Sequence, residues 1–248
     1  MAFDFKKEFK SLYGVKRKPT LVDVPPATYL AVAGTGNPNE ENGAYAEALS
    51  LLYGLSYTIK MSKMGEWQPE GYFDYTVPPL EGLWWAGEGA FNGAQIADKD
   101  ALSWVSLIRQ PDFVTPDVFE WASEVAAKKK PQLVDGLNAG KAHLVRFVEG
   151  LCAQITHVGP YDDEPATIAQ LSDFISSEGL REDISEGGES PVGHSATDVF
   201  DGEEVLKALN TSDGVPVVRL HHEIYLGDPR KTAPEKLKTI IRHPVAAC

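Results

Sequence analysis

The sequence is poor in cysteine, in positive charge and in long apolar segments, and each shortage excludes a class of protein. Cys152 lies in an apolar segment and Cys248 is the last residue, so neither a disulfide framework nor a zinc site of paired cysteines is expected. Lysine and arginine number 23 against 36 aspartates and glutamates, and this net charge of -13 argues against binding nucleic-acid phosphates. We therefore expect no direct nucleic-acid partner.

Two further features are missing. No apolar run is long enough to cross a bilayer, and the opening MAFDFKKEFK lacks the apolar core of a secretory signal. The glycines at Gly34 and Gly36 do not lead into a helix with the spacing of a phosphate loop or a dinucleotide site. We expect a cytoplasmic protein without a membrane partner or a cofactor, and the sequence leaves its oligomeric state open.

Aromatic side chains are concentrated in the stretch GYFDYTVPPLEGLWW, residues 71–85. Alternation over Tyr72–Val77 predicts a strand, which Pro78-Pro79 must bend because proline cannot donate a hydrogen bond to a sheet ladder. The adjacent Trp84 and Trp85 should point to opposite faces, and the sequence does not decide which one faces a cleft. Ordinary core packing would explain any single ring, but the cluster as a whole predicts the wall of a pocket for a flat apolar ligand.

The remainder of the chain alternates strands with amphipathic helices. Periodicity predicts helices that begin near Gly43, Thr115 and Pro165, and a short N-terminal helix around Phe5–Tyr13. Strands are expected over residues 28–35, 101–110, 151–158, 217–226 and 237–245. We expect one domain over residues 1–248, with an N-terminal helical extension at 1–27 and a long insertion at 185–216, in which Val205, Leu206 and Leu209 indicate a short helix.

The two halves of the chain repeat one order of elements. Each half has a strand, an acidic turn with glycine and proline, an amphipathic helix and two further strands. This duplication predicts an α+β fold in which β-α-β-β units form a curved antiparallel sheet, with helices on one face and a ligand cleft at the centre.

Metal binding is not favoured by the acidic or histidine-containing motifs. Asp162-Asp163-Glu164 has some likeness to a metal site, but its position before a helix is better explained by the helix dipole. His221-His222 lacks the spacing of a metal-binding pair on a helix, and no second ligand cluster accompanies it. We expect no metal.

Four strings resemble the stand-alone GyrI-like small-molecule-binding proteins of the SOUL/GyrI-like superfamily. The resemblance covers most of Lys16–Val245 and departs from compact members at residues 185–216. The strings are VPPLEGLWW (Val77–Trp85), IRQPDFVT (Ile108–Thr115), HVGPYDDEPAT (His157–Thr167) and HEIYLGDPRKTAPEKLKT (His222–Thr239).

The resemblance implies an aromatic-lined cleft with an acidic residue at its floor, which binds planar and often cationic compounds. A subfamily with these motifs resembles the cyclopropanoid cyclopropyl hydrolases, which open the strained ring of duocarmycin-type DNA-alkylating compounds with water. The carboxylate of the HEIY strand falls on Glu223, and Tyr161 is the candidate hydrogen-bond donor to the substrate carbonyl. The aromatic cage would comprise Tyr75, Trp84, Trp85, Trp104, Phe113 and Tyr161.

These residue types suit that chemistry. Flat ligands stack between rings, and a partly desolvated Glu223 would have a raised pKa and could take a proton from water. Glu223 could instead be a salt-bridge partner of Arg219 or Arg242. Glu81 is either a second pocket carboxylate or the cap of the turn after Pro79. Other functions that remain open are sequestration of aromatic compounds without turnover, haem binding and inhibition of a topoisomerase.

Overall fold

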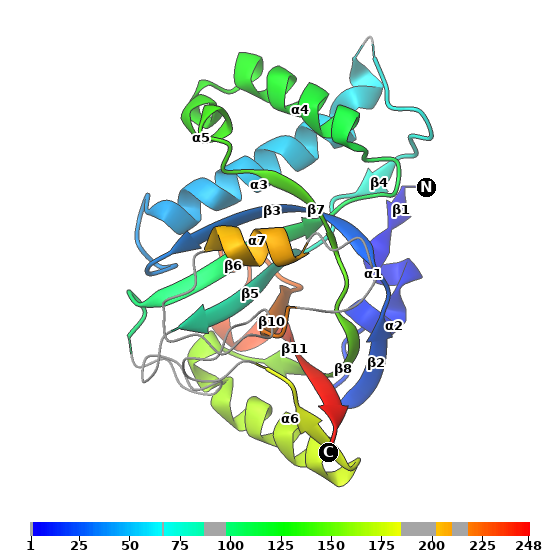
Figure 1. Cartoon of the computed structure of the whole chain (residues 1–248), viewed down its shortest axis with the longest axis vertical. Helices are drawn as coiled ribbons and strands as arrows, with labels where there is room; N and C mark the ends of the chain where they lie inside the picture. The colour runs from blue at the N-terminus through cyan, green and yellow to red at the C-terminus, as the bar shows by residue number, and fades with distance from the viewer. Residues whose placement is uncertain (1, 66, 87–97, 185–201, 210–217) are drawn as a thin grey trace.

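A computed structural model describes residues 2–65, 67–86, 98–184, 202–209 and 218–248, and its main feature is an antiparallel sheet (Figure 1). Nine strands of the described chain join this sheet in the order β2-β8-β11-β10-β5-β6-β3-β7, with β9 paired to β11. The strands are β2 (Thr20–Val24), β3 (Ala27–Thr35), β5 (Leu80–Ala86), β6 (Leu102–Arg109), β7 (His143–Phe147), β8 (Gly150–Val158), β9 (Leu180–Glu182), β10 (His221–Tyr225) and β11 (Lys238–Ala247).

The expected duplication is present. The first unit is β3-α3-β5-β6 and the second is β8-α6-β10-β11, with α3 at Ala44–Lys60 and α6 at Pro165–Ser177. The second strand of the first unit, β5, pairs in antiparallel fashion with the second strand of the other unit, β10, and this pairing joins the two half-sheets. The predicted α+β class with a curved antiparallel sheet is confirmed.

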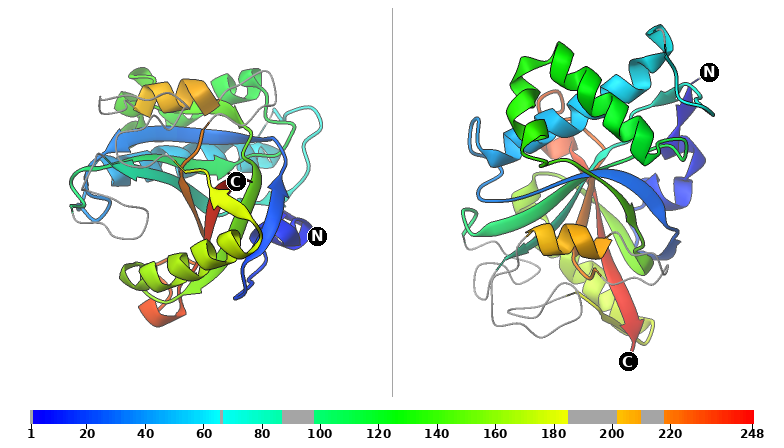
Figure 2. Two further views of the ribbon diagram at one scale, coloured as in Figure 1. Left: turned by 60° about the horizontal axis from the view of Figure 1, so that its bottom comes forward. Right: turned by 45° about the horizontal axis from the view of Figure 1, so that its top comes forward.

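The sheet is strongly curled into a half-barrel because its two ends are made from nearly continuous strands (Figure 2). Pro25 and Pro26 alone separate β2 from β3, and Val148 and Glu149 alone separate β7 from β8. β2 pairs with β8 at one end of the strand order while β3 pairs with β7 at the other. Two prolines cannot continue a hydrogen-bonded ladder, so the chain turns there from one half-sheet to the other.

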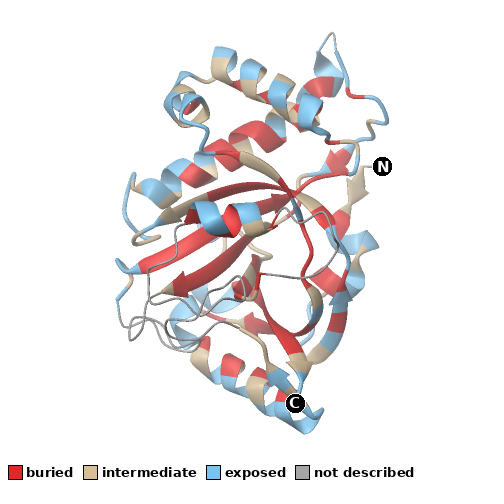
Figure 3. Ribbon diagram, viewed as in Figure 1, coloured by how far each residue is buried: buried red, intermediate tan, exposed pale blue. Residues whose placement is uncertain are grey.

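Helices cover both faces of the sheet. One face, here called the α3/α6 face, packs against α3, α4 (Pro116–Lys129) and α6. The other, here called the α7 face, packs against α1 (Phe5–Glu8), α2 (Lys10–Tyr13) and α7 (Gly202–Leu209) (Figures 1 and 3). The prediction of helices on one face therefore holds for the repeated units, whereas α1, α2 and α7 lie outside the repeat and cover the opposite face.

The remaining elements are short. β1 (Phe3–Asp4) pairs in parallel with β4 (Tyr75–Thr76). The single-turn helices are η1 (Met61–Met64), η2 (Pro131–Leu133), α5 (Val134–Asn138), η3 (Tyr161–Asp163) and η4 (Pro234–Lys236).

Several sequence expectations need correction. The strand predicted over Tyr72–Val77 is reduced to the two residues of β4. The extension at 1–27 is not only helical, because it contributes β2 to the main sheet. The insertion at 185–216 contains α7, whose buried Val205, Leu206 and Leu209 were the residues that indicated a helix. Residues 185–201 and 210–217 lie outside the described residues. None of the described helices has the length and apolar character needed to span a membrane.

Candidate functional site

An aromatic cluster lies on the α3/α6 face where the two half-sheets meet. Trp84 of β5 is the register partner of Trp104 on β6 and of His221 on β10, so all three side chains share this face. Tyr45 of α3 covers the two indoles, with ring centroids 5.6 Å from Trp84 and 5.0 Å from Trp104. Tyr225, at the end of β10, packs at the same place.

Gly82 leaves room for the central contact of this cluster. The Nε1–H of Trp84 donates a hydrogen bond of 2.9 Å to the hydroxyl of Tyr225. A Cβ at Gly82 would lie 2.6 Å from that Nε1 atom and 3.2 Å from the Tyr225 hydroxyl. Gly82 is also the register partner of Glu223, so only glycine allows the indole and the phenol to meet beside the carboxylate.

Glu223 lies against a second carboxyl group, that of Glu164. The two side chains are in hydrogen-bonding contact, and Tyr225 contacts Glu223 on the same strand. Burial and the neighbouring charge of Glu223 raise the pKa of Glu164 well above its ordinary value. Burial acts against ionisation of Glu223 as well, but hydrogen bonds from His221 and Tyr225 outweigh it and lower the pKa of Glu223. Within the pair Glu164 is therefore the carboxyl group that keeps its proton more strongly, and Glu223 is the one that ionises more readily.

This result corrects the expectation that Glu223 has a raised pKa. The carboxyl group with the raised pKa is Glu164, which the sequence placed only at a helix N-terminus. The Nε2 atom of His221 lies 3.0 Å from Glu223 Oε1, and this positively polarised donor keeps the Glu223 carboxylate charged. Burial alone did not determine the direction of the shift.

Glu164 is held in position by the turn that follows β8. Gly159 has a φ of 146°, a conformation that side chains rarely adopt. The Nε2 atom of His157 lies 3.0 Å from the carbonyl of Pro160, and its Nδ1 lies 2.8 Å from the hydroxyl of Thr167. A carbonyl only accepts, so Nε2 carries the proton and Nδ1 accepts from Thr167. His157 thus ties the turn to the first residues of α6 around Glu164.

Tyr161 lies at the edge of the same site. Its ring meets that of Tyr225 edge to face with centroids 5.9 Å apart, and 38% of the residue remains exposed. Burial and the charge of Glu223 raise the pKa of Tyr161 to about 12. At neutral pH the phenol is protonated and can donate a hydrogen bond to a ligand.

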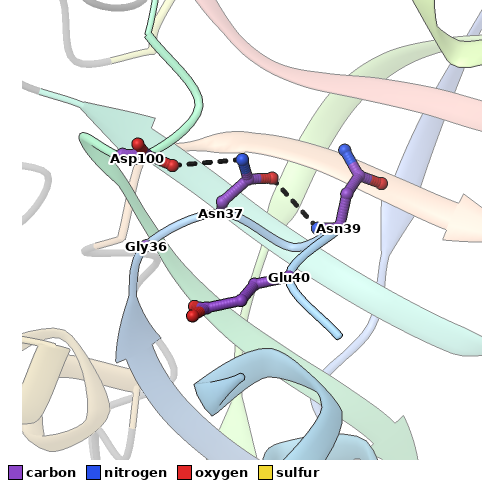
Figure 4. Close-up of a pocket in the computed structure, with 5 residues that line it drawn as sticks. All are labelled: Gly36, Asn37, Asn39, Glu40 and Asp100. Carbon is purple, nitrogen blue, oxygen red and sulfur yellow. Dashed lines mark hydrogen bonds between the residues drawn. The ribbon is translucent and has the colours of Figure 1, made fainter. Parts of the chain in front are cut away.

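An acidic pocket of about 460 Å³ opens at the Trp104 end of the cluster (Figure 4). The Nε1–H of Trp104 points to the carbonyl of Gly36, which lines this pocket, at 3.4 Å. Asn37 donates to Asp100 at 3.1 Å, and Asn39 N donates to Asn37 Oδ1 at 3.0 Å. Glu40 completes the lining. The pocket does not include Glu223 or Glu164, so it flanks the carboxyl pair without containing it.

Four of the expected site residues lie elsewhere. Trp85 and Glu81 occupy the α7 face, because Trp84 and Gly82 take the alternate positions of β5 that face Glu223. Tyr75 is fully buried against the N-terminal helices, with Phe113 packed on it at a centroid distance of 6.0 Å. The expectation that these residues line one pocket with Glu223 is corrected. Trp84, Trp104, Tyr161 and Glu223 do come together.

Glu81 belongs instead to a buried charge network on the α7 face. It lies 3.1 Å from His222 Nε2 and accepts a hydrogen bond of 3.0 Å from Tyr13. His222 Nδ1 is 2.8 Å from Glu149, which also pairs with Arg242 at 3.0 Å. Arg242 in turn donates to the Leu12 carbonyl at 3.1 Å. This network joins the N-terminal helices to the sheet and explains why Glu149 sits at the bend between β7 and β8. It also excludes Arg242 as the partner proposed for Glu223.

Sequence reasoning missed four residues of the site: Tyr45, Glu164, His221 and Tyr225. Tyr225 lies two positions after Glu223, so period-2 alternation alone could have placed it on the same face. Glu164 was considered as a metal ligand or a helix N-terminal charge, and His221 as a metal ligand. Tyr45 was assigned to the apolar stripe of α3. Its contact with Trp84 depends on how the helix crosses the sheet, which periodicity does not reveal.

Comparison with known proteins gives the family. A model of the GyrI-like small-molecule-binding domain matches residues 17–187. Three similar crystal structures come from Listeria innocua. One is an uncharacterized conserved protein that is 45% identical, with a TM-score of 0.77. The match covers 98% of this chain and 100% of that protein's chain. Two further structures are described as a hydrolase. They are 43% and 44% identical, with TM-scores of 0.75 and 0.76 respectively. The matches cover 98% and 99% of this chain and 100% of each of those chains.

The comparison with curated proteins found no match. The family model spans more than half of the chain, and the solved structures share over 40% of its residues across nearly its whole length. The chain belongs to the GyrI-like small-molecule-binding family.

Proposed function

We propose that this protein binds planar aromatic compounds beside Glu223 and hydrolyses a strained cyclopropane ring conjugated to a carbonyl, as in duocarmycin-type alkylating agents. The observation that carries the proposal is the contact between the Glu223 and Glu164 carboxyl groups beside the Trp84–Tyr225 pair, in which the pKa of Glu223 is lowered and that of Glu164 is raised. Trp84, Tyr225 and the exposed Tyr161 supply ring surface for a flat ligand. Detoxification of such compounds is the role we infer.

In the proposed reaction Glu223 takes a proton from a water molecule. The water oxygen forms a bond to the cyclopropane methylene carbon, and the bond between that carbon and the ring system breaks. The electron pair of the broken bond passes into the ring, which becomes aromatic, and the former carbonyl oxygen becomes a phenolate that then gains a proton. Tyr161 donates a hydrogen bond to this oxygen while its charge develops. Glu164, hydrogen-bonded to Glu223, fixes the orientation of the base.

Two further observations support a hydrolase. Two of the similar Listeria innocua structures are described as a hydrolase. The opposite pKa shifts of Glu164 and Glu223 make one carboxyl group the weaker acid and the other the stronger acid within a largely buried setting, a division of roles that acid–base catalysis requires.

The test is incubation of the purified protein with a cyclopropane-bearing compound of this class, followed by mass spectrometry for the water adduct. We expect the adduct with the wild-type protein and a loss of roughly 100-fold or more in rate for Glu223→Gln, since general-base catalysis contributes about that much. Asp173→Asn, an exposed change on α6, is the matched control. An unchanged compound, or full activity in Glu223→Gln, would contradict the proposal.

Non-catalytic sequestration is the second candidate. A carboxylate with a lowered pKa beside the exposed Tyr161 ring also suits a planar cation, which gains both stacking and charge pairing. Quenching of tryptophan fluorescence by such a cation, without any product by mass spectrometry, would favour this function over hydrolysis.

A further inference from the structure

A chain of three hydrogen bonds runs from Glu223 away from the aromatic cluster. His221 Nε2 lies 3.0 Å from Glu223 Oε1, and His221 Nδ1 lies 2.7 Å from His243 Nε2. His243 Nδ1 lies 3.3 Å from Glu182 Oε1. Both imidazoles are buried, whereas the Glu182 side chain on β9 is 23% exposed. His221 and His243 thus connect the carboxylate of Glu223 in the site with the carboxylate of Glu182 near the surface.

The number of protons in this chain follows from its geometry. Each of the three contacts needs one hydrogen between its two heavy atoms, and an ionised carboxylate can only accept. All three hydrogens must therefore be carried by the two imidazoles. Two neutral imidazoles carry two protons in total, so the third makes one of them an imidazolium. The pair carries a single positive charge between two carboxylates.

The surroundings are consistent with this count. Ser172 of α6 donates to Glu182 Oε1 at 2.6 Å, so that oxygen acts as an acceptor. Hydrogen bonds from His243 and Ser172 outweigh burial and lower the pKa of Glu182, which keeps it ionised. Glu164 and Tyr225 reach the far side of Glu223, and Arg181 and Asp183 flank Glu182 on β9 and just after it. Burial lowers the pKa of His243, which disfavours a charge on that ring.

A metal site would need a different arrangement. Among the described residues no group of three or more histidine, cysteine, aspartate or glutamate side chains is placed to hold an ion. The two imidazoles face each other at hydrogen-bonding distance instead of converging on one point. The nitrogen atoms are thus already used for the three contacts.

We propose that His221, His243 and Glu182 form a positioning chain in which the histidine pair shares one positive charge, and that this charge holds Glu223 ionised and fixes its Oε1 atom. The effect on catalysis rests on the proposed hydrolysis, but the charge of the pair does not.

Glu182→Gln is the decisive variant because it keeps the shape and changes the proton count. The NH2 group of a glutamine can donate one hydrogen to His243 Nδ1 and the other to Ser172 Oγ, whose own hydrogen then goes to the Ile168 carbonyl, so all three contacts survive with two protons on the imidazoles. By nitrogen NMR at pH 7 we expect three protonated ring nitrogens in His221 and His243 of the wild type and two in Glu182→Gln. The control Glu178→Gln, an exposed change at the end of α6, should keep three. Two protonated nitrogens in the wild type, or three in Glu182→Gln, would overturn the proposal.

The second readout is the pKa of Glu223, measured by carbon NMR of its carboxyl group. Loss of the adjacent positive charge should raise it by about 1 unit or more in Glu182→Gln. If the protein hydrolyses its ligand, the apparent pKa on the acid side of the pH–rate profile should increase by the same amount in Glu182→Gln. The affinity for the ligand at pH 8 should stay unchanged. Absence of turnover in the wild type contradicts the proposed hydrolysis only. An unshifted Glu223 pKa contradicts the positioning chain.

Discussion

Trp84 Nε1 donates a 2.9 Å hydrogen bond to the hydroxyl of Tyr225, and this contact joins the central strands of the two repeated units. Tyr225 also contacts Glu223, so one phenol connects the aromatic cluster with the carboxyl pair. Neither unit could form this arrangement alone, because the indole comes from β5 and the phenol from β10. The site is a product of the duplication.

Tyr225→Phe should remove this connection. The Trp84 indole loses its acceptor and Glu223 loses a donor, so the pKa of Glu223 should rise and stability should fall by about 1–3 kcal/mol. Urea denaturation checks the stability, and a fluorescence titration with an aromatic cation checks the affinity. Tyr57→Phe, at a residue that is 48% exposed on α3, serves as the control and should change neither. Equal behaviour of the two variants would contradict this role for Tyr225.

Gly82→Ala should impair the site through a single methyl group. The new Cβ would lie 2.6 Å from Trp84 Nε1, so the indole must move away from Tyr225. We expect a stability loss of about 1–3 kcal/mol from overpacking, together with weaker ligand binding. In the control Gly65→Ala the methyl meets only the Ser62 carbonyl at 3.4 Å and neighbouring backbone atoms beyond it. Unchanged tryptophan fluorescence and affinity in Gly82→Ala would show that the indole does not depend on the glycine.

The carboxyl pair predicts opposite pH dependences for two matched variants. The folded-state pKa of Glu164 is raised above its ordinary value of 4.5, so its stabilising contribution is complete below that pH and is lost as pH rises toward the folded-state value. Glu164→Gln mimics the protonated form. Its stability relative to wild type should increase with pH above 4.5.

The pKa of Glu223 is lowered, so its contribution is present above 4.5 and is lost as pH falls through the folded-state value. Glu223→Gln should therefore cost most at neutral pH and least in acid. Urea midpoints between pH 3 and 8 measure both series. Parallel curves for the two variants would contradict the assigned protonation states.

The buried network on the α7 face predicts a stability change in alkali. Contacts with Glu149 and Glu81 outweigh burial and raise the pKa of His222 from 6.5 to about 9. Its contribution is fully present below 6.5 and is lost as pH rises through about 9, a change on the order of a few kcal/mol. The wild type should lose stability over this window, and His222→Gln should lose less.

Glu149→Gln should be among the most destabilising single changes in the chain. Glu149 is buried between His222 and Arg242, and its pKa is lowered to about 2 because these cations outweigh the cost of burial. Removing its charge leaves Arg242 buried without its partner, at a cost of about 3–5 kcal/mol. Thermal unfolding measures this loss of stability, and Glu235→Gln, a substitution at an exposed residue, serves as the control. A loss under about 1 kcal/mol would contradict the role of the network.

The sequence alone determined the class of fold and most of its elements. Alternation and helical spacing act over a few residues, so β3, α3, β5, β6, β8, α6 and β11 could be located from local pattern, and the repeated order of these elements predicted the duplicated sheet. The four motifs identified the family, and of the expected site residues Glu223, Trp84, Trp104 and Tyr161 lie together in the structure.

Only the tertiary structure decided how the charged groups share their protons. The raised pKa of Glu164 depends on Glu223, a partner distant in sequence, and His221 meets His243 only because β10 pairs with β11. Register also decided that Trp84 and not Trp85 faces Glu223. Glu81 was drawn to the α7 face by His222 and Tyr13, because a buried charge is stable only where an opposite charge or a hydrogen-bond donor meets it.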